Sequence, residues 1–182
     1  MKTPLADSEF TVLRQTIASR GTTRMVLLPV TMLGWASLTV VLFLFAELPV
    51  TALLSLAVLV AGFEAIHALH VGVERIGRYL QVCYEGELDG PRWETTAMAV
   101  GPALPGGGID PLFSVVFVCA AVINLIPPAL PGPTPLELAA VGLPHAAFIV
   151  RVVRARGAAA RQRAVELESF KALLLSQRDR DQ

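Results

Sequence analysis

Four ionisable side chains lie in otherwise apolar stretches and have the types and spacing to hold a metal ion. Glu64, His67 and His70 recur at every third residue, and His145 stands alone in a later apolar stretch. At about 100° per residue, a helix places the first three on one stripe. One carboxylate and three imidazoles suit a single zinc, iron or copper ion. Only one Glu-x-x-His motif is present, which argues against a two-metal site.

Other chemistries use the same residues. Haem b would need His145 and either His67 or His70 as its axial ligands. A proton or quinone relay would use Glu64 and the histidines, because such groups are typical of relays inside membranes. The structural alternative is that Glu64 is protonated or bonded to a histidine and only fixes how the helices pair. We favour this alternative for the intramembrane polar network, which comprises Glu64, His67, His70, Asn124 and His145.

The composition is that of a membrane protein. Hydrophobic residues make up 54% of the chain and charged residues only 16%, whereas soluble domains carry about 25% charged residues. The charges gather in the two tails and in one central segment, with apolar stretches between them. The net charge is zero, so no nucleic-acid partner is indicated. The expected partner is the lipid bilayer.

Four stretches have the roughly 20 apolar residues that cross a bilayer. They cover residues 25–46, 49–70, 111–130 and 136–153. The predicted fold is an all-α integral membrane bundle of four transmembrane helices. His67 and His145 are expected at similar depths, near the inner ends of the second and fourth spans, so a side chain of the second span could satisfy His145. Asn124 is expected nearer the outer end.

The basic residues set the orientation. They precede the first span, lie between the second and third, or follow the fourth, and none occurs around Glu47 or in 131–137. Because cytoplasmic loops collect arginine and lysine, both termini are predicted to be cytoplasmic. Nearly all of the basic residues are arginine, which hints at a bacterial origin. We therefore expect a multi-pass protein of the bacterial inner membrane.

Three segments are predicted to lie in the cytosol. Residues 1–24 read as an amphipathic helix on the membrane surface. Residues 71–110 begin as a continuation of the second span to about Glu85, followed by a short helix over 91–100 and a Pro/Gly-rich connector over 101–111. Residues 154–182 read as a second cytosolic helix. The membrane domain comprises residues 25–153.

The chain contains no nucleophilic triad, P-loop or dinucleotide-binding fingerprint, and the sequence leaves open whether it is an enzyme. The favoured function is an accessory or subunit-type protein of a membrane complex. Its partners would be other membrane subunits or further copies of itself. The alternatives are a metal- or haem-binding redox protein that uses Glu64, His67, His70 and His145, and a component of a proton or quinone relay.

Overall fold

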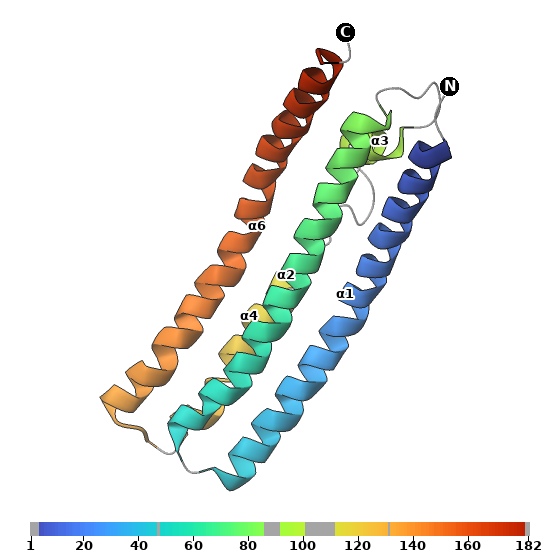
Figure 1. Cartoon of the computed structure of the whole chain (residues 1–182). Coiled ribbons are helices and arrows are strands. Elements are labelled where there is room, and N and C mark those ends of the chain that lie inside the picture. Colours follow the sequence, from blue (N-terminus) through green and yellow to red (C-terminus); the bar gives the residue numbers. More distant parts are fainter. Residues whose placement is uncertain (1–3, 47, 86–91, 101–111, 131, 181–182) are drawn as a thin grey trace. The chain divides into compact units, whose positions relative to one another are not determined.

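The computed structural model describes residues 4–46, 48–85, 92–100, 112–130 and 132–180, and every regular element in these residues is helical (Figure 1). This confirms the predicted all-α class. The elements in chain order are α1 (Pro4–Phe45), the short 3-10 helix η1 (Pro49–Thr51), α2 (Ala52–Cys83), α3 (Trp93–Val100), α4 (Ser114–Ile123), α5 (Ile126–Ala129) and α6 (Pro135–Arg178).

Three helical stretches are long and apolar enough to cross a membrane. They are Asp7–Phe45, Pro49–Cys83 and Pro135–Ala155. The apolar stretch Ser114–Ala129 is shorter and is divided between α4, with 10 residues, and α5, with 4. The break has a local cause, because Pro127 has no amide hydrogen and its ring would clash with the carbonyl group of Ile123 in a continuous helix. The structure therefore gives three long apolar helices and one shorter apolar stretch that is divided into two helices.

The long helices extend beyond the expected spans. The residues expected as a separate N-terminal helix belong to α1, which continues without a break to Phe45, and the last span and the C-terminal segment are both part of α6. The continuation of the second span through Gly72 and Gly77 is confirmed, because α2 ends at Cys83. The predicted short helix over 91–100 corresponds to α3. The connector 101–111 lies outside the described residues.

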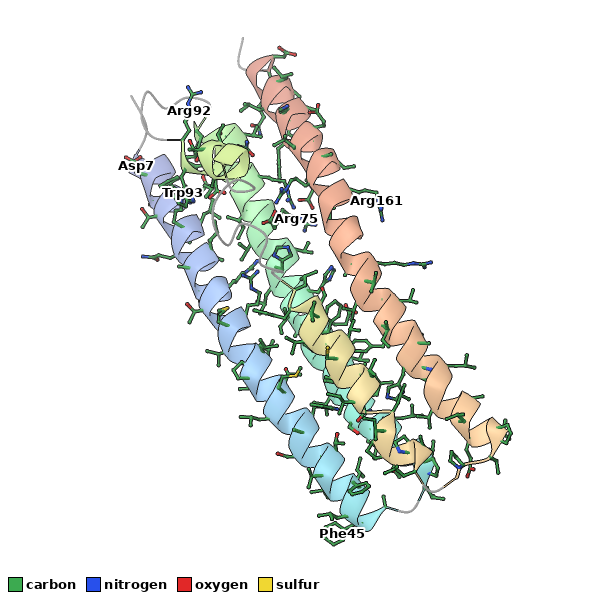
Figure 2. The ribbon with its side chains drawn as sticks, turned by 180° about the vertical axis from the view of Figure 1, so that it is seen from behind. Asp7, Phe45, Arg75, Arg92, Trp93 and Arg161 are labelled. Carbon is green, nitrogen blue, oxygen red and sulfur yellow. The ribbon has the colours of Figure 1, made fainter. Side chains whose placement is uncertain are left out.

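The chain divides into two compact units. Unit 1 comprises Met1–Thr22, Leu69–Ile109 and Ala158–Gln182, and unit 2 comprises Thr23–Ala68 and Asp110–Gly157. Within unit 2, α2 runs between α1 and α6 and α4 packs on one side of α2, as the opposite views of Figures 1 and 2 show. The core of unit 2 gathers around Phe63, whose ring meets Phe117 at 5.3 Å and Phe148 at 5.9 Å edge-on.

Unit 1 is held together by a smaller aromatic group. The ring of Tyr79 lies 5.7 Å from Phe170 of α6 and 6.0 Å from Tyr84, and Tyr84 lies 5.6 Å from Phe10 of α1. These contacts connect α1, α2 and α6 within unit 1. Leu80 is fully buried beside them on α2.

Candidate functional site

The most deeply buried polar pair of unit 2 is formed by His145 of α6 and Asn124, which follows α4. Both residues are at most 1% exposed. His145 Nδ1 lies 2.8 Å from the carbonyl oxygen of Val141, and its Nε2 lies 2.9 Å from Asn124 Nδ2. A carbonyl oxygen can only accept, so Nδ1 carries the hydrogen and Nε2 accepts from the amide. Both ring nitrogens of an uncharged imidazole are thus engaged.

Asn124 also forms hydrogen bonds with groups of α1 and α2. Its second amide hydrogen is donated to the carbonyl oxygen of Ala52, at 3.0 Å. Its Oδ1 accepts from Trp35 Nε1 at 3.2 Å and lies 3.3 Å from the hydroxyl of Thr39, whose stronger bond, at 2.8 Å, goes to the carbonyl oxygen of Trp35. The amide therefore connects α1, α2 and α6 at the junction of α4 and α5. We call Trp35, Thr39, Asn124 and His145 the asparagine network.

A small cavity adjoins the asparagine network. Its volume is about 50 Å³, and Thr39, Ser55 and Asn124 supply polar groups to a wall that is otherwise largely apolar. A cavity of this size has room for water, whereas pockets for organic ligands measure about 300–1,000 Å³. It is therefore too small for haem or a quinone ring.

A second polar group of unit 2 contains a charged pair. Arg151 of α6 donates from Nη2 to Glu64 Oε2 of α2 at 2.8 Å, and the same nitrogen lies 3.4 Å from His67 Nδ1. The guanidinium carbon stands 5.6 Å from the centre of the Phe63 ring, a cation–π contact. The side chains of Arg151 and Glu64 are 41% and 43% exposed.

Sequence reasoning missed Arg151 because it counted this residue with the cytosolic arginines. The signal that could have found it is the flexible stem of arginine, which reaches back along its helix.

The residues of the predicted polar network are thus divided among several partners. His145 meets Asn124, Glu64 and His67 meet Arg151, and His70 is buried in unit 1 one turn before Glu74. Within the described residues, no group of three or more His, Cys, Asp or Glu side chains could hold a metal ion. Cofactor binding by Glu64, His67, His70 and His145 stays a prediction.

Unit 1 contains a buried ion-pair cluster between α2 and α6. The side chain of Arg78 is 4% exposed and donates from Nε and Nη2 to Glu166 Oε2 at 2.8 and 2.5 Å. Arg78 also pairs with Glu74 at 3.2 Å, and Glu74 accepts from Arg163 at 2.6 Å. Burial tends to raise the pKa of Glu166, but hydrogen bonds from Arg78, Gln162 and Arg75 outweigh it, so the pKa is lowered. We call Glu74, Arg75, Arg78, Arg163 and Glu166 the arginine–glutamate cluster.

Two further glutamates of unit 1 bind other elements to the end of α2. Glu85 is 2% exposed and accepts from the backbone nitrogens of Glu94 and Thr95, at 2.6 and 2.9 Å. It therefore caps the N-terminus of α3 from outside that helix, where the helix dipole favours a negative charge. Glu9 of α1 accepts from the hydroxyls of Tyr79 and Tyr84, at 3.1 and 2.5 Å. Burial and the nearby Glu9 raise the pKa of Tyr84.

Comparison of the chain with known protein families, with curated proteins and with solved structures gives no match.

Proposed function

We propose that the protein is a multi-pass membrane protein with four crossings and cytoplasmic termini, and that it serves as an accessory or subunit-type protein of a membrane complex. The observation that carries this proposal is the asparagine network. Both nitrogens of His145 and both amide hydrogens of Asn124 bind groups of the same chain. Polar groups engaged in this way pair helices, and they offer nothing to a substrate.

The same bonds weigh against a cofactor at His145. A metal ion or a haem iron needs the lone pair of an imidazole nitrogen. Nδ1 carries a hydrogen that goes to Val141, and the lone pair of Nε2 accepts from Asn124. A ligand would have to displace Asn124 and leave its amide unsatisfied in an apolar interior, at a cost of about 1–3 kcal/mol.

The contacts within unit 1 support the orientation. This unit gathers the N-terminal, central and C-terminal segments, which carry most of the basic residues. Arg14 of α1 pairs with Glu94 of α3 at 2.7 Å, and Arg78 of α2 pairs with Glu166 of α6. Segments that touch one another lie on the same side of a membrane. With α1, α2 and α6 as three crossings, this arrangement requires a fourth, and the apolar stretch Ser114–Ala129 supplies it.

Reporter fusions test the four crossings and the orientation. Alkaline phosphatase, which is active only outside the cytoplasm, is joined after Thr134 or after Gln182 in otherwise identical chains. We expect activity at Thr134 and none at Gln182. A green fluorescent protein at the same two positions should give the reverse pattern. Phosphatase activity at Gln182, or its absence at Thr134 with fluorescence there, would overturn the threading.

Purified protein tests the structural role of the polar residues. In detergent we expect no Soret band and no stoichiometric metal, even when haem and metal salts are supplied during growth. His145→Gln is expected to lower the unfolding temperature without any change in the absorption spectrum. Haem or one equivalent of metal that is lost on His67→Ala and His145→Ala would instead establish the redox alternative.

A further inference from the structure

The Glu64–Arg151 pair stands out because it is charged, half exposed and inside an apolar segment. Glu64 lies twelve residues after Ala52 of α2, which is about 18 Å along the helix axis. The hydrocarbon region is about 30 Å thick. If α2 enters the membrane near Ala52, as the proposed function requires, the Glu64 carboxylate lies well inside it. Its side chain is 43% exposed and that of Arg151 is 41% exposed in the single chain.

Exposure of this charged pair to lipid is energetically unfavourable. A charged side chain at the centre of a bilayer costs about 2.5–3.5 kcal/mol even on the lowest scales. The long stem of Arg151 allows its head to reach toward the headgroups, whereas the short side chain of Glu64 does not. Ion pairs removed from water are stable only where further polar groups satisfy the remaining lone pairs and hydrogens. A second polar protein surface at the same depth would supply them.

The helix face beside Glu64 is suited to such a surface. Ala57, Ala61, Ala65 and Ala68 are exposed on α2. The core residue Phe63 packs on the opposite side against Phe117 of α4, and both views show α4 covering only one side of α2 (Figures 1 and 2). Small side chains let the backbone of another helix approach closely in a membrane. We call Ala57, Ala61, Glu64, Ala65, Ala68 and Arg151 the open face of unit 2.

The charges of the open face fit a second copy of the same chain. Two copies in one membrane share their orientation, and a two-fold axis along the membrane normal keeps every residue at its depth. Glu64 and Arg151 already lie at one depth, because they pair within the chain at 2.8 Å. Glu64 of one copy is therefore level with Arg151 of the other, and the reverse contact forms at the same time. We infer that the protein forms a two-fold dimer through the open face, in which Glu64 and Arg151 also pair between copies.

Charge reversal with mixed copies tests this inference. Donor- and acceptor-labelled chains are reconstituted in phosphatidylcholine vesicles, and association is measured by energy transfer. We expect dimers of the natural chain, and at least a tenfold weaker association for Glu64→Arg alone or Arg151→Glu alone. When the two variants are mixed, the arginine introduced in one can pair with the glutamate introduced in the other, so association should return toward that of the natural chain. Arg154→Glu reverses an exposed arginine one turn further along α6 and should leave association unchanged.

Each outcome of this experiment either supports or overturns the proposed dimer. Monomers of the natural chain, dimers that ignore both single reversals, or a mixture that fails to associate would each overturn the inference. Circular dichroism of each variant in the vesicles establishes first that its helices are folded, and only folded variants are compared. Correct reporter signals at Thr134 and Gln182 together with monomers would overturn the dimer and leave the proposed threading standing. Reversed reporter signals would remove the basis of both.

Discussion

In unit 2 the helices are paired mainly by apolar packing and by hydrogen bonds between uncharged groups, whereas in unit 1 buried ion pairs add to the aromatic contacts. Unit 2 has an apolar core that includes Phe63, Phe117 and Phe148, and its Asn124 and His145 are fully buried. Unit 1 has instead Arg78, 4% exposed, between two glutamates. Since α1, α2 and α6 contribute residues to both units, the difference lies in their sequences and not in the type of helix.

This difference is expected if unit 2 lies in the hydrocarbon of a membrane and unit 1 lies in water. In hydrocarbon an unmatched charge is expensive, so buried polar groups are few, uncharged and bonded on every side. In water the long side chains of arginine and glutamate can form networks whose outer members stay hydrated, as Arg75 does at 56% exposure. The Glu64–Arg151 pair of unit 2 is the exception, which is why it carries the inference of a dimer. Mutations can test whether the two units depend on these different interactions.

The largest effect is expected from Arg78→Ala. Removing one partner of a buried pair leaves Glu166 uncompensated, which costs about 3–5 kcal/mol. Unit 1 should open, and hydrogen exchange should accelerate in residues 161–178 of α6 while residues 52–66 of α2 stay protected. Arg75→Ala is the matched control, since Arg75 binds the same glutamate but is 56% exposed, and its loss should cost below about 1 kcal/mol. Equal effects of the two substitutions would show that burial does not govern the cluster.

A smaller loss is expected when acid protonates Glu166. The hydrogen bonds of Arg78, Gln162 and Arg75 lower its pKa in the folded state. Its contribution to stability is therefore complete above its ordinary pKa of about 4.3 and is lost as the pH falls through the lowered value. The unfolding temperature, followed by circular dichroism in detergent, should fall in this acidic range. Glu166→Gln should be less stable at pH 7 and should lose part of this slope, and an unchanged slope would contradict the assignment.

The helices were largely predictable from sequence because their signals are local. Three of the four predicted apolar stretches correspond to helices long enough to cross a membrane. The absence of a strong breaker predicted the continuation of α2, which ends at Cys83. The continuity of α1 and α6 was harder to predict, because a change from polar to apolar composition marks a change of solvent without ending a helix. The division at α5 was also missed, although Pro127 and Pro128 stand in the sequence where the third apolar stretch is interrupted.

The pairing of side chains was less predictable. The sequence identified Asn124 and His145 as buried polar residues, but their contact depends on how α4 and α6 pack, which no local pattern encodes. The sequence also identified Glu64 as an ionisable residue within an apolar stretch, but it did not identify Arg151 as its partner. Whether an arginine side chain reaches such a residue depends on where the neighbouring helix lies. For the same reason the pairing of Arg78 with Glu166, from distant parts of the chain, was not anticipated.

A moderate effect confined to unit 2 is expected from Gly62→Ala. A Cβ at this position would overlap the side chain of Thr31, which is 6% exposed on α1, and such overpacking costs about 1–3 kcal/mol. Gly142→Ala is the control, since beyond the chain neighbours and the backbone of its own helix nothing lies within 4 Å of its added Cβ, and it should be neutral or stabilising. In a Trp93→Phe chain, Trp35 remains as the only tryptophan, so its fluorescence reports the unfolding of unit 2. Equal unfolding curves would mean that α1 and α2 are not in close contact there.

The smallest effect is expected for the coupling of Asn124 with His145. Asn124→Leu and His145→Leu should each destabilise unit 2, and the double variant should be more stable than the sum of the two losses predicts. Inside membranes such couplings average about 0.6 kcal/mol and reach about 1.7 kcal/mol. The value should lie in the upper part of this range, because Asn124 Nδ2 and His145 Nε2 are 2.9 Å apart and both residues are buried. Unfolding titrations of the Trp93→Phe chain in mixed micelles measure it. A coupling of zero would mean that the two residues do not depend on each other, and the asparagine network would then not be what holds these helices together.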